Sequence, residues 1–473
     1  MSNLAIFNGQ KVRTKLFSKQ TYFNNTDIES VSEIIKSQIL SGYRGNYGAA
    51  FNGAAHVQKL EFEFASMMKV NHAIAVNSCT SGLQVACGAI GLAPGDECIV
   101  SPWSMICSAT APLLYNAIPV FADIESEYYC LDPKSIKERI TRQTKAIIVV
   151  SLFGIPYDHR LINRIAKQNN LFVIEDAAQA IGSYYTHENV ITNPASKAIQ
   201  YAGTFGDLGV FSFTQGKHLT AGEGGMIVTN DDELAMRCKL IRNHADAVIH
   251  DMSPMNKIKF NSCNLSNNML GFNMRMTEIQ AALLYNMITD EDKEGKKQKR
   301  RLDEFVEMRR DNAEYLYDGI CSQIPAIRRG EVRDGCTHSY YCQSFHWDKD
   351  KADGLHRDKF INAVKAELVP DEGREMEGVL LGNGYIHPLN LFPIFQERKL
   401  YGGTGFPFSL NNNRQYCTDL AKNYSTESIP NTMFLQNEDL FLSLHHRTNL
   451  SIDDREDIIE AFLKVYKYRS ELL

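Results

Sequence analysis

Lys217 is the residue of this sequence best placed for covalent chemistry with a carbonyl group. It follows the aromatic run FSF (211–213) and precedes the glycine-rich return GEGG (222–225). Most lysines lie on surface loops, but the Gly, Phe and Ser residues around this one favour a poorly hydrated position. Loss of hydration favours the neutral amine, which is the nucleophile that Schiff-base chemistry needs. The segment therefore predicts a lysine that bonds to an aldehyde.

Glu175 and Asp176 form an acidic pair near the end of the apolar run LFVIEDAA (171–178). Ligands of open α/β sheets bind at the carboxyl ends of strands, so the pair lies where a site is expected. A buried carboxylate needs a cationic partner, and a protonated heterocyclic nitrogen would be one. An aspartate that only caps the next helix explains this segment equally well.

The turn NSCTSGL (77–83) lies between an apolar run and a helix of small residues. Hydroxyl groups and unpaired backbone N–H groups at a helix N-terminus make a site for phosphate. Taken alone, the turn is better explained as an ordinary N-cap, because Ser and Thr are common there. Taken together, an anion cup, a carboxylate and a lysine meet the three needs of one cofactor, pyridoxal 5'-phosphate.

The order of these segments, with Ser-x-x-x-x-Lys ending at Lys217, resembles the DegT/DnrJ/StrS-type aminotransferases, a family of fold type I. The resemblance runs from about residue 42 to 280 and includes APGDE, PVFADI, EDAAQAIGS, FGDLGVFSF and GEGGMIVT. It extends through GFNMRMTEIQAA (271–282) and resumes at HSYY (338–341). It implies an enzyme of amino-sugar biosynthesis that moves an amino group from glutamate or glutamine to a keto sugar, a sugar nucleotide or a keto cyclitol.

The resemblance also implies roles for individual residues. Lys217 and Asp176 would be catalytic, since Lys217 would bond to the cofactor's aldehyde and move protons while Asp176 keeps the pyridine nitrogen protonated. Gln179 would lie near the 3-hydroxyl of the ring. The phosphate would be held by Thr80, the backbone at Cys79, Ser212 and, from the partner subunit of a homodimer with a composite site, Asn273.

Two positions depart from the family pattern. Cys79 stands where Gly is frequent, and we expect its backbone rather than its thiol to matter. In the run Pro102-Trp103-Ser104-Met105, the position of the aromatic residue that usually stacks on the ring falls on Met105. A thioether packs against an aromatic face, so we expect Met105 to replace the stack and Trp103 to point elsewhere.

Two other functions stay open at this point. A subgroup of the family dehydrates sugars and has His at the lysine position, whereas this chain keeps Lys217 and has His218 beside it. The other function is that of a regulator that binds the cofactor without turnover. The presence of Lys217, Asp176 and Gln179 argues against the regulator.

The elements that must position these residues alternate between short apolar runs and helical stretches. Strands are expected over 72–78, 96–102, 119–124, 145–154 and 171–178, and helices over 81–92 and 277–288. The strand runs are continuously apolar, as in a parallel sheet covered on both faces. The sequence predicts an α/β fold with a mostly parallel central sheet flanked by helices, followed by a smaller α+β domain.

The expected domains are an N-terminal arm (1–25), a large cofactor domain (26–290) and a smaller C-terminal domain (291–473). The charged stretch 290–320 is expected to be a solvated connecting helix, and 367–436 a region of long loops. HSYY and GYIHPLNLFPIFQ (384–396) are expected to line the substrate mouth. His387 and the pair His445-His446 are better explained as structural histidines than as ligands.

Composition excludes several other classes. The chain has 473 residues and a net charge of -6, so nothing favours binding to nucleic acid or to an anionic membrane. Its 11 cysteines are scattered without C-x-x-C spacing, which argues against a zinc site and against a disulfide framework. With neither a signal peptide nor a membrane helix in the pattern, we expect a cytoplasmic protein.

Overall fold

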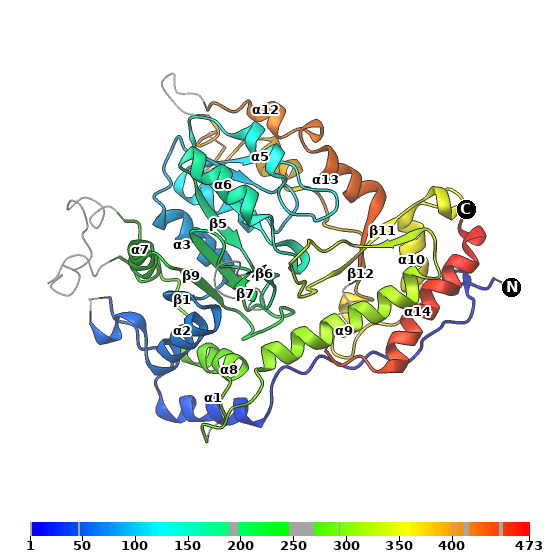
Figure 1. Ribbon diagram of the computed structural model, residues 1–473, viewed down its shortest axis with the longest axis horizontal. Coiled ribbons are helices and arrows are strands. Elements are labelled where there is room, and N and C mark those ends of the chain that lie inside the picture. The colour runs from blue at the N-terminus through cyan, green and yellow to red at the C-terminus, as the bar shows by residue number, and fades with distance from the viewer. Residues whose placement is uncertain are drawn as a thin grey trace.

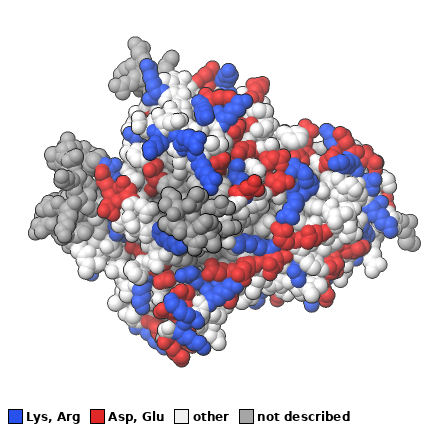
Figure 2. Space-filling view, viewed as in Figure 1, with Lys and Arg blue, Asp and Glu red and all other residues white. Residues whose placement is uncertain are grey.

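The computed structural model describes residues 2–45, 48–188, 197–245, 269–292, 294–400, 402–403, 405–409, 416–443 and 448–473. The pair His445-His446 lies outside these ranges. Within them, no helix has the length and apolar character that crossing a bilayer requires. On the face shown in Figure 2, the Lys and Arg side chains of the described residues are interspersed with Asp and Glu.

A seven-stranded mixed sheet forms the centre of the larger part of the molecule (Figure 1). Its order is β1-β9-β8-β5-β4-β2-β3, and β9 is antiparallel to both of its neighbours while the other pairs are parallel. The sheet is therefore mostly parallel, as predicted. The strands are β1 (His72–Val76), β2 (Glu97–Val100), β3 (Ile118–Phe121), β4 (Thr144–Val150), β5 (Phe172–Asp176), β8 (Leu208–Ser212) and β9 (Gly225–Thr229).

Helices cover both faces of this sheet because its strands are apolar on both sides. Ile74 and Val76 of β1 share a buried cluster with helix α3, whereas the intervening Ala73 and Ala75 belong to a cluster with α2 and α8. This alternation is the period of two that a strand imposes. The covering helices are α2 (Ala55–Met68), α3 (Cys79–Ala89), α5 (Pro133–Arg139), α6 (His159–Asn169), α7 (Asp232–Arg242) and α8 (Glu278–Ile288).

A second, four-stranded antiparallel sheet lies in the C-terminal part of the chain. Phe345 of this sheet packs in one cluster with Phe360 and Phe462 from the helices that cover it. Its strands are β10 (Ile327–Arg329), β11 (Gln343–Trp347), β13 (Leu440–Ser443) and β12 (Leu381–Gly382), and its helices are α9 (Arg301–Cys321), α10 (Arg357–Glu367) and α14 (Ile452–Lys467). This is the α+β arrangement that the sequence predicted.

The stretch between β12 and β13 returns to the large sheet. Its helices are short, namely α11 (Pro393–Gln396), α12 (Leu420–Asn423) and α13 (Pro430–Phe434). Asn423 pairs with the backbone of Phe121 through both its amide atoms, at 2.8 Å each, and the Tyr424 hydroxyl donates to the Pro119 carbonyl. The edge strand β3 is covered in this way by residues that lie about 300 positions later in the chain.

The N-terminal segment packs against the C-terminal part of the molecule before it reaches the large part. Leu4 and Phe17 are buried in the core of the C-terminal sheet, and both chain ends lie on that side (Figure 1). Arg13 forms ion pairs at 2.7 Å with Asp454 and with Asp457 of α14. Helix α1 (Asn25–Ser37) then packs beside α8 of the large part.

The expectation of one helix over 290–320 is wrong, because the helix begins only at Arg301. The preceding residues fold back on themselves, with a bridge between Glu291 and Lys297 and a left-handed Gly295 at φ +78°. Glycine adopts that conformation readily and ends helical geometry. The helix is also not simply solvated, since Phe305 and Leu316 on one face are buried.

Candidate cofactor and active site

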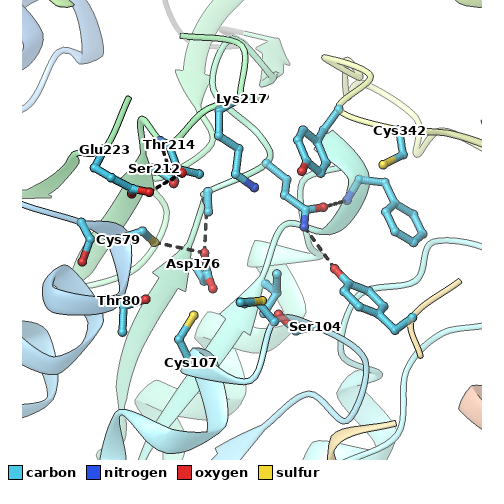
Figure 3. A pocket seen from close by; sticks show the side chains of 18 of the residues that line it. Cys79, Thr80, Ser104, Cys107, Asp176, Ser212, Thr214, Lys217, Glu223 and Cys342 are labelled. Atoms are coloured by element: carbon cyan, nitrogen blue, oxygen red, sulfur yellow. Dashed lines mark hydrogen bonds between the residues drawn. The ribbon is translucent and has the colours of Figure 1, made fainter. Parts of the chain in front are cut away.

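A cavity of about 520 Å³ opens at the carboxyl ends of β4, β5 and β8. Seven of the eight predicted site residues line it, and only Asn273 does not. The seven are Cys79, Thr80, Met105, Asp176, Gln179, Ser212 and Lys217. Figure 3 shows Lys217 and Asp176 facing the middle of the cavity, with Ser212, Thr214 and Cys79 on one side of them and Cys342 on the other.

The N-terminus of α3 forms one side of the cavity and contains the predicted phosphate turn, residues 77–83. Ser78 is the N-cap, and its hydroxyl accepts the Ser81 N–H at 3.0 Å. The N–H groups of Cys79 and Thr80, in the first turn before Ser81, have no carbonyl of the same helix to reach. The hydroxyl groups of Ser212 and Thr214 lie on the same side of the cavity (Figure 3), so that these groups together are suited to an anion.

Gly225 allows this turn to lie against strand β9. A Cβ atom at Gly225 would come within 2.6 Å of the Ser78 carbonyl and 2.7 Å of the Cys79 nitrogen. The glycine-rich return after Lys217 is thus explained by a close backbone approach. Burial raises the pKa of the Cys79 thiol well above its usual value, so this side chain stays neutral and the backbone supplies the polar groups.

Asp176 is the last residue of β5 and is only 3% exposed. Its carboxylate accepts the Ser108 hydroxyl at 2.7 Å and the Ala178 N–H at 3.1 Å, and the Cys79 sulfur lies 3.8 Å away. Burial raises its pKa, although the Ser108 hydrogen bond and the charge of Lys217 act in the other direction. A cationic N–H in the cavity would offset this burial cost, so the site fits a protonated ring nitrogen.

Glu175 points to the other face of the sheet, as successive strand residues must. It does not line the cavity and instead accepts hydrogen bonds from the Ser151 hydroxyl at 2.8 Å and the Phe205 N–H at 3.3 Å. Burial raises its pKa to about 7. The adjacent acids singled out in the sequence therefore separate into one that faces the cavity and one that lies below the sheet.

Lys217 is half-buried, and its Nζ lies 4.0 Å from the centroid of the Tyr341 ring. Its backbone is fixed at both ends, because its N–H donates to Thr214 and its carbonyl accepts the Tyr22 hydroxyl, each at 3.2 Å. The neighbouring His218 is fully buried and contacts the Ser339 carbonyl at 2.9 Å. Burial holds the pKa of His218 well below its usual value, so it joins the lysine loop to HSYY as a neutral side chain.

Gln179 lines the cavity and makes two hydrogen bonds within its wall. Its Oε1 accepts the Phe153 N–H at 2.7 Å, and its Nε2 donates to the Tyr385 hydroxyl at 3.1 Å. Tyr341, Gly384 and Tyr385 all line the cavity, which places one residue of HSYY and two of the stretch 384–396 at the site. His387 in the same stretch is exposed and does not line the cavity.

Met105 and Asn273 are both exposed, but only one of them lines the cavity. Met105 lines the cavity but is 62% exposed, whereas Trp103 is completely buried in another cluster. Asn273 is exposed, lies outside the cavity and accepts a hydrogen bond from Arg275 at 2.8 Å. Its expected position over the phosphate of a partner subunit stays a prediction.

Sequence reasoning missed several residues that line the cavity or support it. Ser104 and Ser108 are four positions apart, and their hydroxyls lie 3.1 Å from each other, so Ser104 links the cavity wall to the Asp176 contact. The four-residue spacing of these two serines was the only feature of the sequence that could have indicated this contact. The lining residues missed altogether were Cys107, Val150, Phe153, Thr214, Glu223 and Cys342.

Comparisons with known proteins agree with this geometry. The model of the DegT/DnrJ/EryC1/StrS aminotransferase family matches residues 29–418. The spore coat polysaccharide biosynthesis protein SpsC of Bacillus subtilis is 30% identical, over 93% of this chain and 94% of its own. The L-glutamine:2-deoxy-scyllo-inosose aminotransferase of Streptomyces kanamyceticus is 28% identical, over 100% of this chain and 98% of its own.

Solved structures share the fold. An aminotransferase from Psychrobacter cryohalolentis superposes with a TM-score of 0.72 at 24% identity, covering 95% of this chain and 99% of its own. A 3-amino-5-hydroxybenzoic acid synthase gives a TM-score of 0.71 at 20% identity, covering 97% of this chain and 100% of its own. With a family model that spans most of the sequence and a cavity that gathers its motif residues, the chain belongs to the DegT/DnrJ/EryC1/StrS aminotransferase family.

Proposed function

We propose that this protein is a pyridoxal 5'-phosphate-dependent aminotransferase that moves an amino group from glutamine or glutamate to a keto sugar or keto cyclitol. The convergence of the phosphate turn, Asp176 and Lys217 on one cavity carries this proposal. The Streptomyces relative, whose name gives L-glutamine and 2-deoxy-scyllo-inosose, supports the choice of substrates.

The residues of the chain divide the work of such a reaction among them. The bound cofactor would supply an aldehyde and a ring that accepts electrons. Asp176 would hold the ring nitrogen in its protonated state, since its buried carboxylate gains a cationic partner there. The Lys217 amine, which reaches the cavity beside Tyr341, would take a proton from Cα of the amino donor and return it at C4′, the aldehyde carbon of the cofactor.

Retention of Lys217 favours transamination over the dehydration carried out by relatives with His at that position. The adjacent His218 does not take over, because its ring is buried against Ser339 and is absent from the cavity lining. A regulator without turnover would have no use for a lysine amine and a buried carboxylate held in the same cavity. We therefore keep the aminotransferase as the single proposed function.

We further propose that two copies of the chain form the complete site in the cytoplasm, with Asn273 from one copy reaching the phosphate of the other. Asn273 is exposed, and large apolar side chains are exposed on two helices beside α8, which follows it. These are Ile28 at 64% and Ile35 at 53% on α1, and Phe62 at 76% on α2. The ten cysteines within the described ranges are all free thiols, which supports a reducing compartment.

Reduction with borohydride tests the proposed chemistry. Protein reconstituted with pyridoxal 5'-phosphate is expected to absorb visible light, and borohydride is expected to fix the cofactor to the peptide that contains Lys217. Lys217→Ala should still bind the cofactor but show no fixed adduct and no turnover of L-glutamine with 2-deoxy-scyllo-inosose. An adduct on another lysine, or no visible band in the wild type, would overturn the proposal. Sedimentation of the same sample as a monomer would contradict the two-copy site.

A further inference from the structure

A chain of neutral hydrogen bonds supports the cavity wall opposite the phosphate turn. It runs from the Phe153 backbone through Gln179, Tyr385 and Gln436 to the indole of Trp103. Trp103 is the aromatic residue that was expected to point away from the cofactor ring. Tyr385 comes from the stretch expected at the substrate mouth. Both are therefore connected to Gln179, whose place at the cofactor was predicted.

The directions of these hydrogen bonds leave the hydroxyl proton of Tyr385 without an acceptor in the described part of the chain. The Phe153 N–H can only donate, so the Gln179 atom that faces it at 2.7 Å must be the carbonyl Oε1. The Nε2 group then donates to the Tyr385 oxygen at 3.1 Å. Because that oxygen accepts, its own proton is available for another acceptor. Among the residues that the structure describes, the Tyr385 hydroxyl has no other hydrogen-bond partner, and the side chain lines the cavity.

The tyrosine is held firmly in this position. Gln436 donates from Nε2 to the Tyr385 carbonyl and accepts the Trp103 Nε1–H at 2.7 Å through Oε1. The Trp103 ring lies edge-on to the Tyr385 ring, with centroids 5.9 Å apart. The preceding Gly384 adopts φ +101°, and a Cβ there would meet Trp103 at 3.0 Å. Burial raises the pKa of the Tyr385 hydroxyl, which keeps it a neutral donor.

The arrangement of the cavity fixes which cofactor atom this wall would face. A ring with its nitrogen at Asp176 and its aldehyde at Lys217 would lie along the line between these two residues. Its phosphate arm would lie on the side of Ser212, Thr214 and Cys79 (Figure 3). The 3-hydroxyl oxygen, next to the aldehyde on the ring, would then be on the opposite side, with Cys342. The Cys342 N–H donates to the Phe153 carbonyl at 3.2 Å, so the Gln179–Tyr385 pair is on that side too.

We propose that Tyr385 is a further cofactor-binding residue, whose hydroxyl donates a hydrogen bond to the phenolate oxygen of pyridoxal phosphate. Gln179 and Tyr385 together would stabilise the negative charge on that oxygen. Trp103 and Gln436 would act as positioning residues, because they touch Tyr385 and not the cavity. This inference rests on the proposed function for the presence of the cofactor.

The pH titration of the bound cofactor's visible absorption tests this contact without any substrate. Tyr385→Phe removes only the hydroxyl group, and loss of a donor to an anionic oxygen disfavours the deprotonated state. The midpoint of the titration should rise by about one pH unit. Tyr424→Phe makes the same change in a buried tyrosine whose hydroxyl donates to Pro119 outside the cavity, so its midpoint should equal that of the wild type.

Each outcome decides the inference. A raised midpoint in Tyr385→Phe but not in Tyr424→Phe supports it. An unchanged midpoint overturns it, as does a defect confined to the Michaelis constant for the keto acceptor, which would assign the hydroxyl to that substrate. If Tyr385→Phe cannot be purified, Trp103→Phe should raise the midpoint by a smaller amount, and no rise overturns the contact. A wild type without a visible band would instead refute the proposed function.

Discussion

The two walls of the active-site cavity differ in charge. They also differ in how far apart in the sequence the residues that form each wall lie. The phosphate-side wall consists of strand ends and the turns that follow them, and it carries Asp176 and Lys217. The opposite wall contains Tyr341 and Tyr385 and is held by neutral hydrogen bonds. Two of these bonds join residues 206 and 333 positions apart.

This difference suggests a division of labour. The charged groups that we propose handle protons lie on the rigid edge of a sheet, where strand geometry fixes their direction and burial tunes their ionisation. The neutral wall comes from loops of the C-terminal part, where side chains can change without disturbing the sheet. Variants at the charged wall should therefore affect chemistry and pH dependence, and variants at the neutral wall should affect fine positioning.

Asp176→Asn should have the largest effect among variants that keep Lys217. It removes the negative charge from the buried pair that Asp176 would form with the ring nitrogen, and such losses cost about 3–5 kcal/mol, so turnover should fall roughly 10²–10⁴-fold. Steady-state kinetics of L-glutamine with the keto acceptor measure this. Glu175→Gln is the matched control one residue away on the other face, and its turnover should stay within about threefold. Equal losses in both variants would refute the separate roles.

The pH dependence of stability should also come from this edge of the sheet. Burial raises the pKa of Glu175 from 4.5 to about 7, so the folded protein binds this proton more tightly than the unfolded chain does. The contribution of Glu175 to stability is then fully present below pH 4.5 and is lost as pH rises to about 7. The loss is on the order of 3 kcal/mol.

Urea unfolding of wild type and Glu175→Gln between pH 5 and 8 measures this contribution. The neutral glutamine does not titrate, and the Ser151 hydroxyl can accept its amide N–H, so the variant should gain stability relative to wild type as pH rises. A difference in unfolding free energy that is constant with pH would show that Glu175 does not titrate in this range.

Gly225→Ala should have a smaller effect, confined to cofactor affinity. The added Cβ would displace the Ser78–Cys79 turn, where it approaches backbone atoms to 2.6 Å. A loss of about 1.4 kcal/mol in binding free energy would raise the dissociation constant of the cofactor about tenfold, as measured by absorption titration. Gly382→Ala adds the same atom in open space on β12, beside the second sheet, and should bind the cofactor as wild type does. Equal affinities in the two variants would count against the turn as the phosphate site.

Much of the charged wall could be read from the sequence because its residues follow their strands directly. Asp176 closes an apolar run, Ser212 ends the next strand of the site, and Cys79 and Thr80 open a helix of small residues. Each is placed by local geometry once the strand is recognised. The expected helix over 290–320 failed for the opposite reason, since helix-forming charged residues before Arg301 have no apolar face to bury and turn back instead.

The amino-acid sequence by itself determined the fold class and the family, and it predicted the residues of the charged wall. Those properties depend on the period of apolar residues and on short motifs, which act over a few positions. Only the tertiary structure decided that Glu175 lies away from the cavity, that Ser108 binds Asp176 and that Tyr385 meets Gln179. Contacts of this kind depend on which strands become neighbours and on which loops return to them, and no local pattern of residues encodes that choice.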